Sequence, residues 1–201
     1  MYFASILGLM LFSLVVSQSV PAECTALKAD TPGSDLVDFL RHSLDTPLSG
    51  RSTECIEFAL EQLNFKRSSD TVPVVVNYLD FERPLTPAEK EGFSFHGGPR
   101  NIGGRYPATG ALVMAGKAAV PALVSAIKTD SSPMVRRNAT YTIMQIFRTE
   151  PAKGVDLLKQ EALTSSAQAS ANLKGAAAIA IQWCNEKQRA QCEYVAHGEN
   201  R

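Results

Sequence analysis

A succession of short amphipathic helices joined by very short turns is the feature that most constrains the fold of this chain. Apolar residues recur at intervals of three and four in SDLVDFLRHSL and ECIEFALEQLNF, as on one face of a helix. Pro107, Pro121 and Pro133 each fit a first helical turn, where the missing N–H is not needed. The stretch TVPVVVNYLDF also suits a strand, but its Pro73 and its neighbours favour a helix. The sequence therefore predicts an all-α fold.

Further local signals set the expected helix boundaries. Gly116 fits the tight turn between two of the helices, and Ser132 fits the N-cap of the helix that begins at Pro133. The stretch NEKQRAQCEYV, from Asn185, is expected to form a separate last short helix.

Parts of the sequence also repeat. NATYTIMQI aligns with GAAAIAIQW at an offset of 37 residues, and CIEFALEQL aligns with PATGALVMA at an offset of 52. These offsets indicate a unit of about 35 residues, with two helices each, repeated about three to four times. The excess in the longer offset predicts an insertion after the first or second unit. We expect a short α-α superhelix, in which each helical hairpin packs on the next.

One unit carries a specific resemblance. The stretch GKAAVPALVSAIKTDSSPMVRRNATYTIMQI resembles a HEAT repeat of the short bacterial type, related to the HEAT-like repeats of phycobilin lyases. The resemblance implies a solenoid that holds other molecules, and it implies no catalytic activity. It also implies that Asp130 and Arg136 have a structural role and tie helices together. The residues that match the repeat pattern are Val120, Pro121, Leu123, Asp130, Val135, Arg136 and Ala139.

The N-terminal segment is typical of a secretory signal peptide. Residues 3–16 form an apolar block of 14, too short to span a bilayer comfortably. Small or branched residues in Val20-Pro21-Ala22 favour cleavage after Ala22, which leaves 23–201 as a single helical domain. We expect a periplasmic or secreted protein with no stable membrane insertion after cleavage. An uncleaved membrane anchor is the alternative.

Export would make the four cysteines a disulfide framework. Two lie near each end of the mature chain, so the spacing favours the pairs Cys24–Cys55 and Cys184–Cys192 among three connectivities. Each bridge would staple one end of the array. Four buried free thiols are the alternative if the chain is not exported. The sequence contains no CxxC motif and no Cys/His spacing that suits zinc, so we expect no metal site.

The helical pattern is interrupted between residues 82 and 107. This insertion contains a capping box with proline at the first helical position, TPAE, followed by about 14 residues of predicted loop. The glycine pairs in FHGGPRNIGGRY match neither a P-loop nor a dinucleotide fingerprint. A structural Ω-like loop, a partner contact and a small anionic ligand site remain open. The candidate binding residues are His96, Arg100, Arg105 and Tyr106.

Composition and motifs favour a binding protein. Lys plus Arg equals Asp plus Glu at 20 each, so we expect no nucleic-acid partner. No HExxH or GxSxG motif is present, and we expect neither catalysis nor a cofactor. The prediction is an exported scaffold for a protein or peptide partner. The alternative is a small-ligand carrier or enzyme with its site around His96, Arg100 and Arg105, with Glu89 or Glu91 as an acid–base partner of His96.

Overall fold

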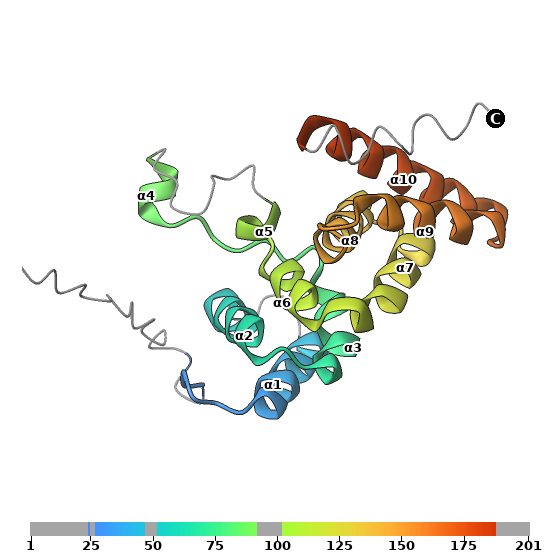
Figure 1. Ribbon diagram of the computed structural model, residues 1–201. Helices are drawn as coiled ribbons and strands as arrows, with labels where there is room; N and C mark the ends of the chain where they lie inside the picture. Colours follow the sequence, from blue (N-terminus) through green and yellow to red (C-terminus); the bar gives the residue numbers. More distant parts are fainter. Residues whose placement is uncertain (1–23, 25–26, 47–51, 92–101, 188–201) are drawn as a thin grey trace, which may run out of the picture.

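The computed structural model describes residues 24, 27–46, 52–91 and 102–187, with side chains as far as Cys184. Within these ranges the chain is helical and contains no strand, which confirms the all-α prediction (Figure 1). The expected signal peptide, residues 1–22, lies outside the described residues. The helices are α1 (Gly33–Asp45), α2 (Thr53–Lys66), η2 (Ser69–Thr71), α3 (Val72–Val75), η3 (Val76–Tyr78), α4 (Pro87–Lys90), α5 (Ile102–Arg105), α6 (Pro107–Ala115), η4 (Gly116–Ala119), α7 (Val120–Thr129), α8 (Pro133–Ile146), α9 (Pro151–Leu163) and α10 (Ala167–Lys187).

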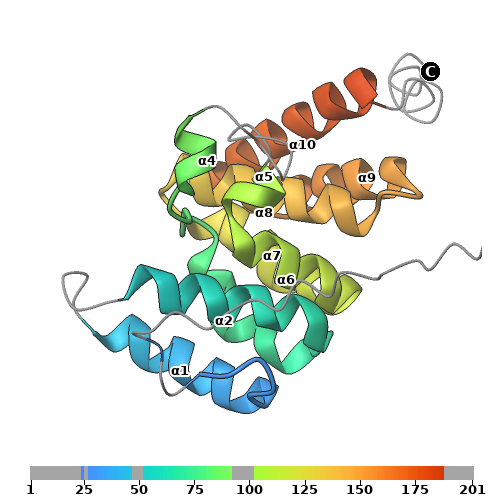
Figure 2. The same cartoon turned by 90° about the vertical axis from the view of Figure 1, so that its left-hand side faces the viewer.

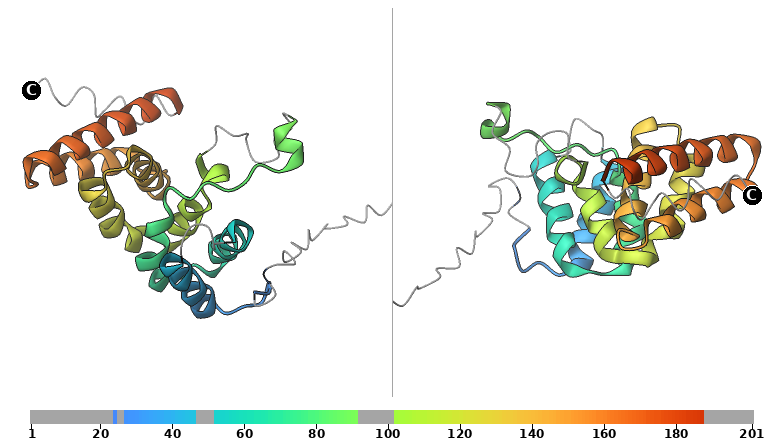
Figure 3. Two further views of the ribbon diagram at one scale, coloured as in Figure 1. Left: turned by 180° about the vertical axis from the view of Figure 1, so that it is seen from behind. Right: turned by 45° about the horizontal axis from the view of Figure 1, so that its top comes forward.

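The described helices form consecutive hairpins. The pairs are α1 with α2, α3 with α6, α7 with α8, and α9 with α10, and the second helices α2, α6, α8 and α10 pack on one another in that order. The array runs from α1 at one end to α10 at the other (Figures 1, 2 and 3). This is the arrangement expected of a helical solenoid. Fully buried leucines and isoleucines from successive helices form one continuous core, among them Leu36, Leu60, Leu112, Leu123, Ile143, Leu158 and Leu173.

Prolines and glycines set the helix boundaries as predicted. Pro107, Pro121 and Pro133 each lie in the first turn of α6, α7 and α8. Gly116 ends α6 with φ of 67°, a conformation that favours glycine. Gly110 in α6 allows close approach to α2, because a Cβ there would lie 2.7 Å from Oδ1 of Asn64. Small residues are thus part of the packing between hairpins.

One segment of the described chain, Pro107–Thr129, is long and apolar enough to cross a membrane, with a mean hydropathy of 1.7 in its most apolar window. Length and composition are the only grounds for that match, and core helices of globular proteins also meet them. Here the segment bends at Gly116 into α6 and α7. Leu112, Leu123 and Ile127 on these helices are fully buried in the core. The segment is therefore weak evidence for a transmembrane span.

Three local predictions need correction. The insertion lies between the two helices of the second hairpin, α3 and α6, whereas the repeat offsets placed it after a complete unit. The end of the predicted loop forms the short helix α5. The backbone N–H of Tyr106 donates to Ile102 O at 2.9 Å and closes this helix. A separate last helix was expected from Asn185, but α10 continues unbroken to Lys187. In the last two cases a helical segment forms or continues where local composition indicated an interruption.

Candidate functional site

Arg83 closes the base of the insertion. Its side chain forms a bidentate ion pair with Glu89, with Nη1 to Oε2 at 2.8 Å and Nη2 to Oε1. Its Nε donates to the carbonyl of Gly104, and its backbone N–H donates to the carbonyl of Arg105 at 3.0 Å. The side chains of Arg83 and Glu89 are only 6% and 2% exposed. We call Arg83, Glu89, Gly104 and Arg105 the clasp, because Arg83 joins the two ends of the insertion.

The helix α4 orients Glu89 within the clasp. Thr86 Oγ1 accepts from the Glu89 backbone N–H at 3.2 Å, and Glu89 Oε2 accepts from the Thr86 backbone N–H at 3.0 Å. This is the predicted capping box. Hydrogen bonds from Arg83 and from the Thr86 backbone lower the pKa of Glu89 to about 2. Glu89 therefore stays ionised near neutral pH, and it does not suit the suggested role of acid–base partner to His96.

The helix α2 carries a carboxyl group with a strongly raised pKa. Burial raises the pKa of Glu57 to about 7, and the charge of Glu61, one turn further along α2, adds to this rise. Arg83 acts in the opposite direction, whereas Glu54 and Glu89 contribute small further increases. Burial is thus the main reason that the pKa of Glu57 lies well above the ordinary value of a carboxyl group.

Arg105 and Tyr106, two of the candidate binding residues, lie at the base of the insertion. Arg105 forms an ion pair with Glu82, while its Nη1 is buried and has no hydrogen-bond partner among the residues that the structure describes. Tyr106 is 5% exposed, and its burial raises the pKa of its phenol. The other two candidates, His96 and Arg100, lie outside the described residues. The structure thus places Arg105 and Tyr106 at the base of the insertion, and their binding role stays a prediction.

The insertion also contacts the second half of the array. Tyr141 on α8 accepts a hydrogen bond from the backbone of Gly103 in α5, which opposes the rise that burial causes in the pKa of Tyr141. The Tyr141 ring packs edge-to-face against Trp183 of α10, with centroids 5.9 Å apart. Arg137, one turn before Tyr141 on α8, is exposed. Tyrosine, tryptophan and arginine are the residue types that most often contribute binding energy at protein interfaces.

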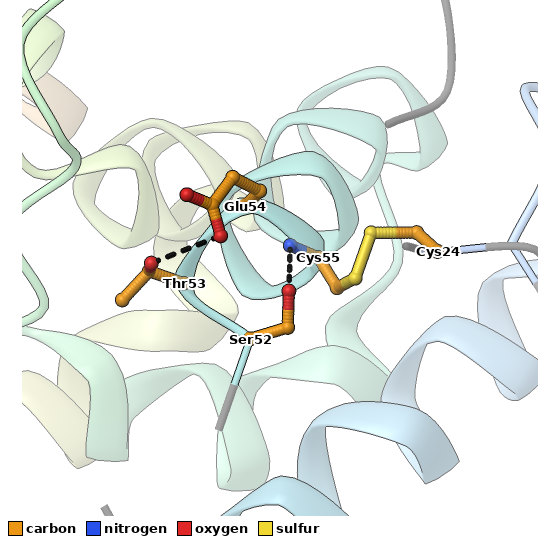
Figure 4. Close-up of a disulfide and its surroundings, with 5 residues drawn as sticks. All are labelled: Cys24, Ser52, Thr53, Glu54 and Cys55. Atoms are coloured by element: carbon orange, nitrogen blue, oxygen red, sulfur yellow. Dashed lines mark hydrogen bonds between the residues drawn. A yellow bond between two sulfur atoms is a disulfide. The ribbon is translucent and has the colours of Figure 1, made fainter. Parts of the chain in front are cut away.

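A disulfide joins the N-terminal segment to α2, as predicted. Cys24 and Cys55 are bonded and buried, with their Cα atoms 5.4 Å apart (Figure 4). Ser52 caps α2 through a hydrogen bond from the Cys55 backbone N–H at 3.4 Å. Cys184 is buried near the end of α10 and is also disulfide-bonded. Its expected partner, Cys192, lies outside the described residues, so that pairing stays a prediction.

The turn between α7 and α8 is held by the residues of the repeat pattern. Arg136 Nη1 donates to the carbonyls of Asp130 and Ser131 at 2.7 and 2.8 Å. Asp130 Oδ1 accepts from the Ser132 backbone N–H at 2.7 Å, and Ser132 caps α8. Arg136 thus contacts the carbonyl of Asp130, not its carboxylate. Both side chains contact the turn, with Pro121 in the first turn of α7 and Val135 buried in α8.

Sequence reasoning missed Arg83 and Glu57. The capping box located Glu89 at the start of α4, but nothing in the motif identified the arginine that its carboxylate binds. Glu57 lies on a helix with many charged neighbours, and only its burial distinguishes it from them. In the part of the chain that the structure describes, no group of three or more His, Cys, Asp or Glu side chains is placed to hold a metal ion.

Comparison with known proteins adds no family. No protein-family model matches the chain, and no curated protein or solved structure shows significant similarity to it. The likeness to HEAT repeats consequently depends on the residues of the α7–α8 hairpin alone.

Proposed function

We propose that this protein is an exported HEAT-like scaffold that binds a protein or peptide partner, with the insertion at residues 82–107 as part of the binding surface. The Cys24–Cys55 disulfide supports an oxidising compartment. The stacked hairpins support a scaffold, because helical solenoids present extended surfaces to partners.

The clasp is the observation that carries this proposal. A hairpin such as α7–α8 needs only Asp130, Ser131 and Ser132 between its helices. The second hairpin instead carries an insertion whose base is fixed by a buried ion pair. Burying two charges costs free energy that a short turn would not require. A long segment on a rigid base is the usual form of a recognition loop.

The test replaces residues 92–101 with a short Gly-Ser linker and leaves the clasp intact. A wider deletion that includes Glu89 would leave Arg83 buried without its carboxylate and would confuse folding with binding. Mature protein from Glu23, with and without the replacement, is used for affinity capture from the native exported fraction. Captured proteins are identified, purified and tested for direct binding.

Specific binding by the intact chain alone would support the insertion as the recognition element. Equal binding by both forms would place recognition on the helical array. A matched control, Arg148→Ala, changes an exposed charge at the end of α8 and should bind as the intact chain does. If neither form binds a protein or peptide, the scaffold proposal fails.

A second candidate function has one observation in its favour. The buried Nη1 of Arg105, which has no partner within the described ranges, is a donor that a carboxylate or sulfate would satisfy. A small-ligand carrier, or an enzyme with its site there, should therefore gain thermal stability from citrate or sulfate. That gain should disappear in Arg105→Ala and persist in Arg148→Ala. No stabilisation of the intact protein by these anions would count against the carrier.

A further inference from the structure

We propose that Arg137 and Tyr141 of α8 and Trp183 of α10 form a docking surface for an acidic peptide segment of the partner, with Arg105 of α5 at its border. This inference rests on the binding function proposed above. It adds the location of the surface and the charge of the segment that binds there. We call these four residues the arginine–aromatic surface.

Contacts between helices bring the aromatic side chains of this surface together. The rings of Tyr141 and Trp183 pack edge to face with their centroids 5.9 Å apart, and both residues stay partly exposed. Tyr141 also accepts a hydrogen bond from the backbone of Gly103, which fixes α5 beside α8. In Figures 1 and 3, α5 lies on the side of the array formed by α2, α6, α8 and α10. The surface therefore spans three elements on one side of the array.

Arg137 supplies a positive charge beside the rings. It lies four residues before Tyr141, so the two side chains share one face of α8. Arg137 is exposed, and it forms no ion pair within the described part of the chain. Its guanidinium is therefore open to a carboxylate from a partner.

Arg105 supplies a second donor at the border of the surface. Glu82 binds its Nε and Nη2, whereas its buried Nη1 has no hydrogen-bond partner among the described residues. Arg105 lies two residues after Gly103, the residue of α5 that contacts α8. The exposed Asp80, which follows η3, is a further carboxylate whose charge acts on the neighbouring phenol of Tyr106, as do those of Glu82 and both arginines.

The charges along the array favour an acidic segment on α8 and α10. The sequence of α8 contains two arginines and no carboxylate, and residues 167–184 of α10 contain Lys174 and no carboxylate. On α2, by contrast, three carboxyl groups recur at helical spacing, Glu54, Glu57 and Glu61. Like charges would repel an acidic segment from α2. Charge complementarity therefore directs such a segment to the arginine–aromatic surface.

The aromatic rings favour a peptide over a free anion. Guanidinium groups bind carboxylates through charge-assisted hydrogen bonds, and partly exposed aromatic rings bury apolar side chains of a partner. A segment in which acidic and apolar side chains alternate satisfies both kinds of group. A small anion such as sulfate satisfies only the arginines.

The fluorescence of Trp183 reports binding directly, because Trp183 is the only tryptophan of the chain. The probe is a blocked hexapeptide of sequence EEFEEF, titrated into the mature protein at low salt. The control peptide QQFQQF keeps the apolar side chains and lacks the charges. We expect EEFEEF to change the emission of Trp183 saturably and QQFQQF to bind at least about fivefold more weakly. Calorimetry on the same samples gives the dissociation constants.

Two variants test the contribution of Arg137. Arg137→Ala should weaken the binding of EEFEEF about three- to tenfold. Lys174→Ala removes an exposed positive charge nine residues before Trp183. Nine residues correspond to about two and a half helical turns, so this charge lies on the opposite side of α10. Lys174→Ala should therefore bind EEFEEF as the unmodified protein does.

Several results would overturn the proposal. They are equal binding of the two peptides, calorimetric binding without a change in Trp183 emission, and unchanged binding by Arg137→Ala. The absence of EEFEEF binding would also overturn it. If sulfate alone changes the emission as EEFEEF does, the surface is a small-anion site instead. If the emission changes with protein concentration alone, a second copy of the chain occupies it.

The probe and the capture experiment above fail independently. A captured partner whose binding is the same in Arg137→Ala would leave the scaffold standing and overturn the arginine–aromatic surface as its docking surface. If EEFEEF binds at Trp183 but no protein or peptide is captured from the exported fraction, the scaffold proposal loses its partner, whereas the acidic-peptide site stands.

Discussion

Arg136 and Arg83 each stabilise a connection between two helices of the array, but through different contacts. Arg136 donates to two backbone carbonyls in the turn between α7 and α8, five and six residues before it. Arg83 binds the buried carboxylate of Glu89. It also donates to the carbonyls of Gly104 and Arg105, which lie more than twenty residues further along the chain. The first contact is local and involves no ionisable partner. The second closes a long segment and depends on the charge of Glu89.

The difference shows how a repeat accommodates an insertion. A three-residue turn has little freedom, and backbone hydrogen bonds suffice to fix it. An insertion of about 25 residues loses far more entropy on ordering, so a stronger contact must hold its ends together. A buried ion pair provides that contact and makes it specific. It also makes the base of the insertion sensitive to acid, because the ion pair requires an ionised Glu89.

The largest effect is expected from Arg83→Ala. This change leaves Glu89 buried without its partner and separates the two ends of the insertion. We expect a loss of about 3 kcal/mol in the free energy of unfolding. Urea denaturation followed by circular dichroism measures it.

The control for Arg83→Ala is Arg41→Ala. Arg41 forms an ion pair with Asp38, but both side chains are exposed on α1. Its removal should change the free energy of unfolding by less than about 0.5 kcal/mol. A loss for Arg83→Ala as small as that of the control would show that the buried pair does not stabilise the fold.

Acid should weaken the ion pair between Arg83 and Glu89 at the base of the insertion. The pKa of Glu89 is lowered to about 2 by Arg83, so the stability that it contributes is complete above about pH 4.5 and is lost as pH falls towards 2. We expect the melting temperature of the intact protein to drop over this range and that of Arg83→Ala to drop much less. Glu150→Gln removes an exposed carboxylate with a lowered pKa and should keep most of the drop. An equal drop in Arg83→Ala would contradict the assignment.

Arg136→Ala should have a smaller effect. It removes two hydrogen bonds from a partly exposed guanidinium to the carbonyls of Asp130 and Ser131. Water can replace this donor, so we expect a loss of about 1 kcal/mol, with no change in pH dependence between 2 and 4.5. Urea denaturation at pH 7 and pH 3 checks both points. A loss in the free energy of unfolding equal to that of Arg83→Ala would contradict the contrast between the local contacts of Arg136 and the long-range contacts of Arg83.

The same contrast explains what the sequence could predict. Helix boundaries follow from local chemistry, so Pro121, Ser132 and Gly116 were placed correctly from their neighbours alone. The Cys24–Cys55 pair followed from the position of the cysteines in the chain. Arg83 was not identified, because its partners are defined only when residues 83 and 104–105 meet.

The candidate site shows the same limit. Arg105 and Tyr106 were selected as binding residues for their side-chain chemistry, but that chemistry does not reveal the pairing with Glu82 or the burial of the phenol ring. Glu57 is equally hidden, because desolvation depends on the packed structure. Local patterns predict elements, whereas long-range contacts decide what an ionisable side chain does.

The smallest effect is expected from Glu57→Gln, and it has the most specific signature. Because the pKa of Glu57 is raised to about 7, its ionisation destabilises the folded protein as pH increases from about 4.5 through 7. Water screens this half-buried carboxyl, so we expect Glu57→Gln to gain only about 0.5 kcal/mol at pH 8 and nothing at pH 4. Urea denaturation at the two pH values measures the difference, with Glu54→Gln as the matched control on the same helix. A gain of the same size at pH 4 would mean that the amide simply packs better than the acid, and that ionisation of Glu57 does not destabilise the fold.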